Sequence, residues 1–372
     1  MTNSWAIVIG INYYQRHPER RLKYAVQDAQ LVYEFLCDYA QFPKDHVILC
    51  LGDEAHRDTS DYPLCSNLLG LLTQDLHPDR IGKVDRFWFF FAGHGVSRNG
   101  RDYLITSDSL IGDIDLRIAL QLDEVIACLR QHQNAEIVLI LDSCRQIVGS
   151  RDFGDSLGEE TVKLAESRGI TTIFSCDYGQ FSHELDGKKH GSFTYAFIEG
   201  LKQHTLPNQL ETYLQRCVPE LNSQDGKSSR QTPRIRVDSV SRTYQPLLPE
   251  CATRVDIEAI IQIATRAELE GDFEEAKSLW WKVIEVSHSE AQLIEARKVI
   301  ERIAEKSSKA QSNLPMRSKE GKDGKKNQLE PIQTSIQALM DLNPDDWNKK
   351  SKDVKQSVWN KIARFLFEER DL

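Results

Sequence analysis

Two residues with reactive side chains, His94 and Cys144, each follow directly after an apolar run. His94 comes after RFWFFFAG (86–93) and is followed by Gly95, and Cys144 comes shortly after EIVLILD (136–142). Nucleophilic cysteine catalysis needs a thiolate and a base that can later donate a proton to the leaving amine. An imidazolium beside Cys144 would stabilise its thiolate. The pair therefore predicts a cysteine nucleophile that is activated by a histidine.

Gly95 adds a feature that the reaction can use. A glycine lets the backbone approach a substrate carbonyl closely, so the N–H groups of Gly95 and Cys144 could form an oxyanion hole. Taken singly, each residue has a simpler explanation, because a lone histidine is more often structural and a lone cysteine more often belongs to the core. The eight cysteines are scattered without a C-x-x-C pair, which argues against a zinc site and against a disulfide framework.

Alternating apolar runs and amphipathic stretches must position these residues. Apolar runs predict strands at 5–11, 46–52, 86–93, 136–142 and 170–175, with an edge strand at 233–237. Helical spacing predicts helices near 22–36, 64–77, 122–132 and 192–203. This rhythm is typical of an α/β fold with a mostly parallel sheet flanked by helices. His94 and Cys144 would then meet at the carboxyl ends of adjacent strands, where ligand crevices form.

Taken together, the motifs resemble those of the caspase and metacaspase family of cysteine peptidases. His94 precedes Cys144 by about 50 residues, as in caspases. The similar segments are GHG (93–95), DSCR (142–145), AIVIGINYY (6–14), LKYAVQDA (22–29) and HGSFTYAFIEGL (190–201). The resemblance covers residues 1–245 and implies a caspase-like fold with His94 and Cys144 as the catalytic dyad. The chain has DSCRQIVG where metacaspases usually have DSCHSG, so its loop after Cys144 departs from theirs.

The resemblance also implies an acidic substrate site. Metacaspases place one acid in the helix after the first strand and another two residues before the nucleophile, positions that Asp28 and Asp142 match. A guanidinium or ammonium group between two carboxylates would relieve their repulsion and form charge-assisted hydrogen bonds. The predicted substrate therefore has Arg or Lys before the cleaved bond. Asp177 is a further candidate, because its segment lines the site in metacaspases. The alternatives are a solvated helix position for Asp28, a turn cap for Asp142 and an ordinary loop acid for Asp177.

Two further features concern the loops around the expected site. An enzyme that cuts after basic residues could cleave its own loop at Arg151 in GSRDFGDS, although an uncut active-site loop is the alternative. Calcium-dependent relatives carry a dense acidic site, whereas this chain has only the loose set Asp108, Asp113 and Asp115. We expect no metal and no other cofactor, with calcium as the alternative.

The composition divides the chain into four segments. We expect a peptidase domain at 1–245, a tetratricopeptide-like helical hairpin region at 252–305, a flexible basic linker at 306–330 and a small helical interaction module at 331–372. The hairpin region and the last module make up a small all-helical C-terminal region, and the basic linker connects them. One hairpin cannot bury its own apolar face, so it is expected to pack on the peptidase domain or on a partner.

The overall charge narrows the function further. A net charge of −9 gives no general attraction to nucleic acid or to an anionic membrane. The chain shows neither a signal peptide nor a membrane-spanning run, so a cytoplasmic protein is expected. The leading prediction is an Arg- or Lys-specific cysteine endopeptidase, gated or recruited to a partner protein through its C-terminal helices. By analogy of fold, it would act in prokaryotic defence or regulated cell death. The alternatives are a non-catalytic scaffold and a separase-like or gingipain-like peptidase.

Overall fold

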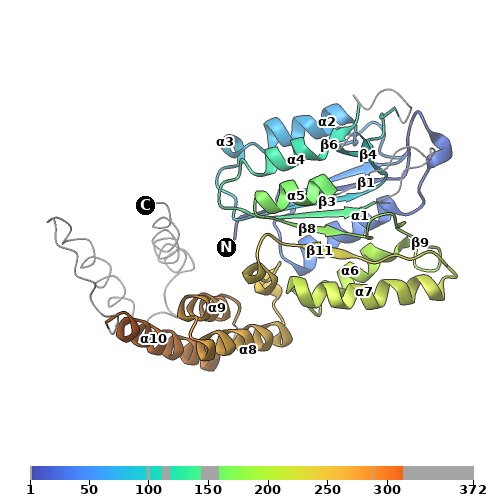
Figure 1. The fold of residues 1–372 in the computed structure, drawn as a ribbon. Helices are drawn as coiled ribbons and strands as arrows, with labels where there is room; N and C mark the ends of the chain where they lie inside the picture. The colour runs from blue at the N-terminus through green and yellow to red at the C-terminus, as the bar shows by residue number, and fades with distance from the viewer. Residues whose placement is uncertain (1, 99–100, 111–117, 144–158, 288, 313–372) are drawn as a thin grey trace. The chain divides into compact units, whose positions relative to one another are not determined.

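A six-stranded sheet lies between two layers of helices (Figure 1). The computed structural model describes residues 2–98, 101–110, 118–143, 159–287 and 289–312, and Asn3–Lys309 form one compact unit. The strand order is β11-β8-β7-β3-β1-β2, with β11 antiparallel to β8 at one edge and the other neighbours parallel. The predicted fold class is therefore confirmed.

The elements follow the expected βαβ rhythm. The central strands are β1 (Ser4–Ile11), β2 (Val47–Gly52), β3 (Arg86–Ala92), β7 (Glu136–Asp142), β8 (Ile170–Phe174) and β11 (Arg234–Arg236). Two small antiparallel sheets consist of β4 (Gly95–Arg98), β5 (Arg101–Leu104) and β6 (Leu120–Gln121), and of β9 (Glu184–Leu185) and β10 (His190–Gly191). The helices up to residue 224 are α1 (Ala25–Glu34), α2 (Cys65–Gly70), α3 (Pro78–Ile81), α4 (Leu122–Leu129), α5 (Glu159–Ser167), α6 (Ser192–Leu201) and α7 (Pro207–Gln224). One π-helical turn extends α1 (Phe35–Tyr39) and another extends α2 (Leu71–Asp75).

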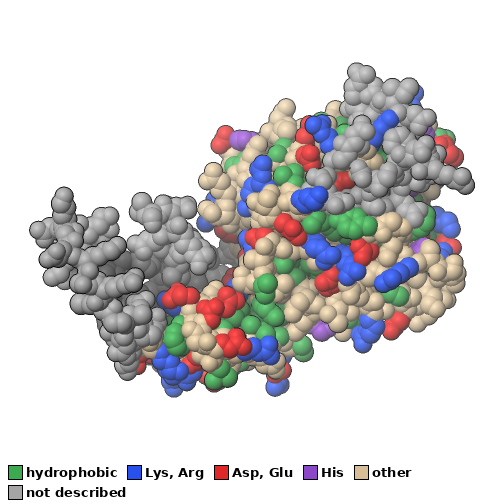
Figure 2. Space-filling model, viewed as in Figure 1, with side chains coloured by type: hydrophobic (Ala, Val, Ile, Leu, Met, Phe, Trp, Pro, Cys, Tyr) green, Lys and Arg blue, Asp and Glu red, His purple; other side chains and the backbone are tan. Residues whose placement is uncertain are grey.

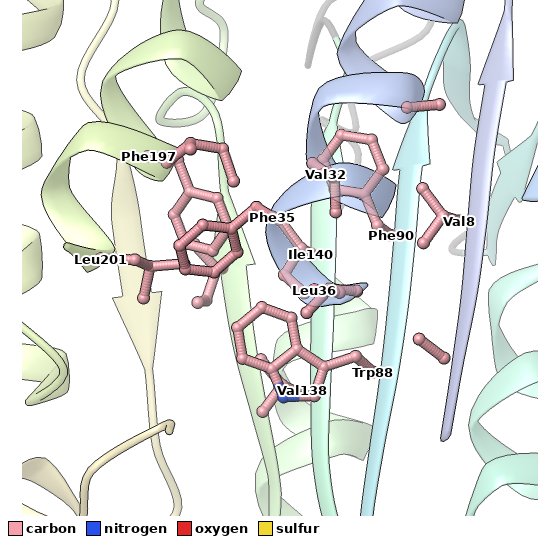
Figure 3. Packing of buried hydrophobic residues seen from close by; sticks show 14 of the residues in the cluster. Val8, Val32, Phe35, Leu36, Trp88, Phe90, Val138, Ile140, Phe197 and Leu201 are labelled. Carbon is pink, nitrogen blue, oxygen red and sulfur yellow. The ribbon is translucent and has the colours of Figure 1, made fainter. Parts of the chain in front are cut away.

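Both faces of the sheet are buried, as the continuous apolar strands predict. Side chains alternate along β3, so Trp88 and Phe90 enter one core while Phe87, Phe89 and Phe91 enter the other. Helices α1, α6 and α7 cover the Trp88 face, where Val32 and Phe197 pack (Figure 3). Helices α2, α4 and α5 cover the opposite face. These layers pack on β3 and β7 from both faces and so fix the points where the chain leaves their carboxyl ends.

Helix α1 is drawn close to the sheet at its first turn. A Cβ on Gly10 of β1 would collide with the carbonyl oxygen of Ala25, so this approach requires glycine. The helix has no side-chain cap of its own, but Asn12 Oδ1 accepts from the N–H of Val26 at 3.1 Å. Glu184 Oε1 accepts from the N–H of Lys23 at 2.8 Å, which places a negative charge at the positive end of the helix. These contacts fix the first turn, which carries Asp28.

Three helices follow the sheet domain, where the sequence predicted a helical hairpin region. They are α8 (Arg254–Glu270), α9 (Phe273–Val286) and α10 (Glu290–Ser312), and Gly271 ends α8 in the left-handed conformation at φ 83°. Their shared core includes Leu206, from the start of α7, so the hairpin buries its apolar face partly against the sheet domain. The division near residue 250 stays a prediction.

Asp256 fastens α8 to the loop between α6 and α7. Its carboxylate is fully buried and accepts from the N–H and hydroxyl of Thr205 at 3.1 and 3.0 Å. It also accepts from the N–H of Thr253 at 2.8 Å, which completes a capping box at the start of the helix. The same side chain therefore caps the start of α8 and joins this helix to the loop between α6 and α7.

Part of the predicted linker is helical. Helix α10 runs to Ser312, so residues 306–312 belong to it rather than to a structureless tether. The sequence of this stretch, KSSKAQS, has no large apolar residue, and its Lys, Ala and Gln residues are compatible with helix formation. The rest of the linker, 313–330, and the predicted module at 331–372 lie outside the described residues.

Candidate active site

His94 lies directly after the central strand β3, at the carboxyl edge of the sheet. Ala92 is paired with Asp142 of the neighbouring parallel strand β7, and the N–H of Gly93 donates to the carbonyl of Asp142 at 3.2 Å. Two residues beyond this rung, the chain reaches His94 on one strand and Cys144 on the other. The topology thus brings the carboxyl ends of β3 and β7, which are far apart in the sequence, to one edge of the sheet.

Main-chain and aromatic contacts orient the His94 ring. The ring packs on Tyr14 with centroids 4.8 Å apart, and the Tyr14 hydroxyl accepts from the N–H of His94 at 2.9 Å. Nε2 lies 2.7 Å from the carbonyl oxygen of Arg20. Because a carbonyl can only accept, Nε2 carries the proton and Nδ1 is the basic nitrogen of the neutral ring. Burial lowers the pKa of His94 below its ordinary value, so the ring is neutral and able to act as a base near neutral pH.

The predicted nucleophile Cys144 and the predicted self-cleavage residue Arg151 lie outside the described residues. The chain is described up to Ser143, whose carbonyl accepts from the hydroxyl of Ser175 at 3.3 Å. This bond ties the start of the Cys144 loop to the end of β8. Gly95 begins β4 immediately after His94 and is half-buried, next to the site where an oxyanion hole is predicted.

Five of the described cysteines are poor nucleophiles. Burial raises the pKa of the thiols of Cys65 and Cys251 to about 11, and it also raises the pKa of Cys37, Cys50 and Cys128. A thiol is an effective nucleophile only as its thiolate, which a raised pKa disfavours. These residues therefore fit the interpretation that most cysteines of the chain are small core residues.

Asp28 and Asp142 come together at this edge of the sheet, with Gly191 of β10 between them. A Cβ built on Gly191 would lie 2.8 Å from Oδ2 of Asp28 and 3.0 Å from Oδ2 of Asp142. The N–H of Gly191 donates to both oxygens of Asp28 at 3.0 Å. One oxygen of each acid therefore lies close to the same spot in front of the Gly191 Cα, where a Cβ would crowd both oxygens.

Both carboxylates are costly to ionise in this position. Burial raises the pKa of Asp28 to about 7. The charge of Asp142 adds to this rise, and the hydrogen bond from His190 opposes it. Burial likewise raises the pKa of Asp142, although the hydroxyls of Ser182 and Thr194 donate to its two oxygens at 2.6 Å. Two buried acids that share one space are stabilised by a cation that neutralises them.

Asp177 lies after the adjacent strand β8, but its carboxylate is already engaged. Nε of Arg234 donates to Oδ2 of Asp177 at 2.8 Å, and Nη2 of Arg234 lies 2.7 Å from the same oxygen. The N–H of Tyr178 donates to Oδ1 at 2.9 Å. With a guanidinium already in place, Asp177 offers less negative charge to a substrate than Asp28 and Asp142 do. Its role in substrate binding stays a prediction.

Several residues that build the site were not anticipated from the sequence. His190 contacts Asp28, Thr194 and Ser182 bind Asp142, and Gln231 donates to Ser182 at 3.1 Å. His190 and Thr194 belong to the segment HGSFTYAFIEGL, whose similarity to metacaspase-like sequences was the one available signal. Nothing in the pattern singles out Gln231, whose buried amide also accepts from the hydroxyl of Ser192 at 2.8 Å.

The described residues contain no group of three metal-binding side chains placed to hold an ion. Asp108 of the loose acidic set accepts from the N–H of Cys65 at 3.0 Å, and Asp113 and Asp115 lie outside the described residues. The cofactor prediction stays untested.

On the face drawn in Figure 2, acidic and basic side chains are interspersed. No helix in the described part of the chain is both long enough and apolar enough to cross a bilayer.

Comparisons with known proteins add a family assignment. A family model described as the caspase domain matches residues 3–245. A search of curated proteins found no match. Among solved structures, caspase-1 from Spodoptera frugiperda is similar with a TM-score of 0.41 and 13% sequence identity, over 63% of this chain and 86% of that chain.

Proposed function

Because the chain belongs to the caspase-domain family, we propose that it is a cysteine endopeptidase of the metacaspase-like type that cleaves proteins after Arg or Lys. One observation carries the specificity. Oδ2 of Asp28 and Oδ2 of Asp142 lie 2.8 and 3.0 Å from a Cβ built on Gly191, at the same sheet edge as His94. A buried acidic pair on the sheet edge that carries the general base favours a substrate with a cationic side chain.

In the proposed reaction, His94 Nδ1 accepts the thiol proton of Cys144, and the thiolate attacks the carbonyl carbon of the scissile bond. The N–H groups of Gly95 and Cys144 stabilise the negative oxygen of the tetrahedral intermediate. The imidazolium then donates its proton to the leaving amine as the C–N bond breaks, which leaves an acyl-enzyme. His94 next activates a water molecule that hydrolyses the thioester and releases the carboxylic acid.

The direct test uses fluorogenic peptides that end in Arg, Lys or Asp. We expect the purified protein to cleave the Arg or Lys peptides and the Cys144→Ala protein to cleave none, because the nucleophile is lost. The same variant is expected to stay uncut at Arg151, where we propose that the active enzyme cleaves its own loop. The measurement is peptide fluorescence, with and without calcium, together with mass spectrometry of the protein.

Each other outcome of this test has a defined meaning. A preference for Asp peptides would contradict the acidic pair as the substrate site while leaving the dyad in place. Cleavage at Arg151 in the purified Cys144→Ala protein would contradict self-processing. If wild-type protein cleaves none of the peptides, even after incubation with a cell extract, the alternative of a non-catalytic scaffold is favoured.

We further propose that the C-terminal helices gate the peptidase or recruit it to a partner protein, in the cytoplasm and in a defence or cell-death response. Support for gating comes from the contact between Asp256 and Thr205, since Thr205 follows α6 and α6 begins at Ser192, directly after Gly191. Helix α6 also carries Thr194, which binds Asp142. A change at α8 can therefore reach the substrate site through a single helix.

Asp256→Ala tests this coupling. The variant loses the hydrogen bonds to Thr205 and Thr253, so we expect the free energy of unfolding to fall by about 3 kcal/mol. At a temperature where it stays folded, we expect kcat/KM to fall by about threefold to tenfold through α6. Glu258→Ala, which removes an ion pair with Arg254 on the same helix, is the control and should change neither quantity appreciably. Unchanged cleavage by folded Asp256→Ala protein would contradict control through this contact.

A further inference from the structure

We propose that His190 is a specificity-determining residue that makes the acidic pair select a guanidinium group over an ammonium group. The inference rests on the proposed function, because it concerns the side chain that the pair of Asp28 and Asp142 binds. Beyond that function, His190 would make the site prefer Arg over Lys before the cleaved bond. His190 acts through Asp28 and does not itself touch the scissile bond.

The position of the His190 ring is fixed on two sides. Nδ1 lies 3.0 Å from Oδ1 of Asp28, and the ring stacks on Tyr195 with centroids 6.4 Å apart. The Lys188 ammonium in turn lies over the Tyr195 ring, 5.0 Å from its centroid. The His190 side chain is 22% exposed and that of Asp28 only 5%, so the imidazole lies between the acid and the solvent.

This contact decides which oxygen of Asp28 is offered to a substrate. An ionised carboxylate only accepts, so Nδ1–H of His190 donates to Oδ1, while the N–H of Gly191 is shared between Oδ1 and Oδ2 at 3.0 Å each. The two donors hold the carboxylate plane: Oδ1 takes the His190 hydrogen bond, and Oδ2, which shares the Gly191 N–H, lies toward the spot in front of Gly191. Asp142 presents its own Oδ2 to the same spot. The pair thus offers one oxygen from each of two separate acids.

A guanidinium group fits this arrangement better than an ammonium group. Arginine has a rigid planar fork of donors that can reach two separate acceptors at once, whereas lysine carries a compact charge that binds as a point. If His190 were absent, Asp28 Oδ1 would lose a donor and the carboxylate could rotate. A lysine ammonium could then meet both oxygens of Asp28 alone. His190 therefore favours Arg by preventing this second arrangement.

The test compares His190→Ala with His190→Asn, whose side-chain amide can donate from nearly the position of Nδ1. With peptidyl-Arg and peptidyl-Lys substrates, we expect the wild-type protein to prefer Arg by about tenfold or more in kcat/KM. His190→Ala should reduce that preference at least about fivefold through KM, with kcat changed by less than about twofold, and His190→Asn should keep it. A purely structural role would lower the rates for both substrates together.

A binding measurement separates this inference from the proposed function. Calorimetry of Cys144→Ala protein with butylguanidine and with pentylamine is expected to show the same preference, and adding His190→Ala is expected to remove it. If wild-type enzyme cleaves after Arg but His190→Ala keeps the full preference, the role of His190 is overturned and the proposed function stands. If no peptide is cleaved but the probes bind with the expected preference, the role of His190 stands and the proposed function falls. Equal binding of both probes by a folded protein that has His190 overturns the inference.

Discussion

His94→Gln should lower kcat/KM for the preferred peptide by about a thousandfold, which is within the range for removal of a general base. Glutamine can still donate to the Arg20 carbonyl, which His94 Nε2 approaches to 2.7 Å, so the loop should keep its shape. What disappears is the basic nitrogen, and with it both the proton acceptor for Cys144 and the proton donor for the leaving amine. Alkylation of the protein by iodoacetamide should slow as well, because the thiolate loses its stabilising partner.

The pH profile gives this prediction a second readout. Burial lowers the pKa of His94, so in the wild-type protein the ring stays neutral down to a pH below the ordinary pKa of histidine. Below that pH both members of the dyad carry a proton, the thiolate cannot form, and kcat should fall. His94→Gln should lack this acidic limb. His77→Gln, at a half-buried position just before α3, should retain both the rate and the limb. Full activity of folded His94→Gln protein would exclude His94 as the base.

The central sheet could be predicted because its strands carry a complete signal. Along β3, five consecutive aromatic residues leave no polar face, and β7 reads as aliphatic throughout its inner positions, so both had to be strands buried on two sides. Once these strands are taken as parallel neighbours, their carboxyl ends lie at one sheet edge, and the sequence predicts that His94 and Cys144 meet there. The family resemblance, and not periodicity, supplied Asp28 and Asp142.

Other parts of the molecule carry no comparable signal. Strands such as β9 and β10 have only two residues each, too few to show alternation. Helix α7 contains Pro219, which disguises the helical spacing of Leu210, Leu214 and Val218. The carbonyl of Arg20 that orients His94 is a main-chain atom, and main-chain atoms leave no trace in residue types. His190 and Asp28 lie 162 positions apart, so their contact depends on the finished fold.

Asp142→Asn should raise KM for Arg peptides by about 10- to 100-fold, the range for losing one charged hydrogen bond to a buried partner. Asparagine is the informative substitution because the hydroxyls of Ser182 and Thr194 can rotate to donate to its oxygen and accept from its amide. Alanine would leave both hydroxyls without their acceptor and would confuse binding with folding. The measurement is KM and kcat for one Arg peptide across a range of pH.

The acidic limb of KM should also move, and its direction can be worked out. Asp28 must be ionised to bind a cation, so in the wild-type protein binding improves as the pH rises through about 7, the pKa of Asp28. The charge of Asp142 is one cause of that raised pKa, so removing it should shift the limb to lower pH even as binding weakens. Alkylation of Cys144 should keep its own pH profile, because the dyad is untouched. Asp177→Asn is the matched control, since Arg234 already neutralises that acid, and it should change KM by less than about threefold. An equal loss in both variants, with no shift of the limb, would mean that net charge at this edge, and not the pair in front of Gly191, holds the substrate.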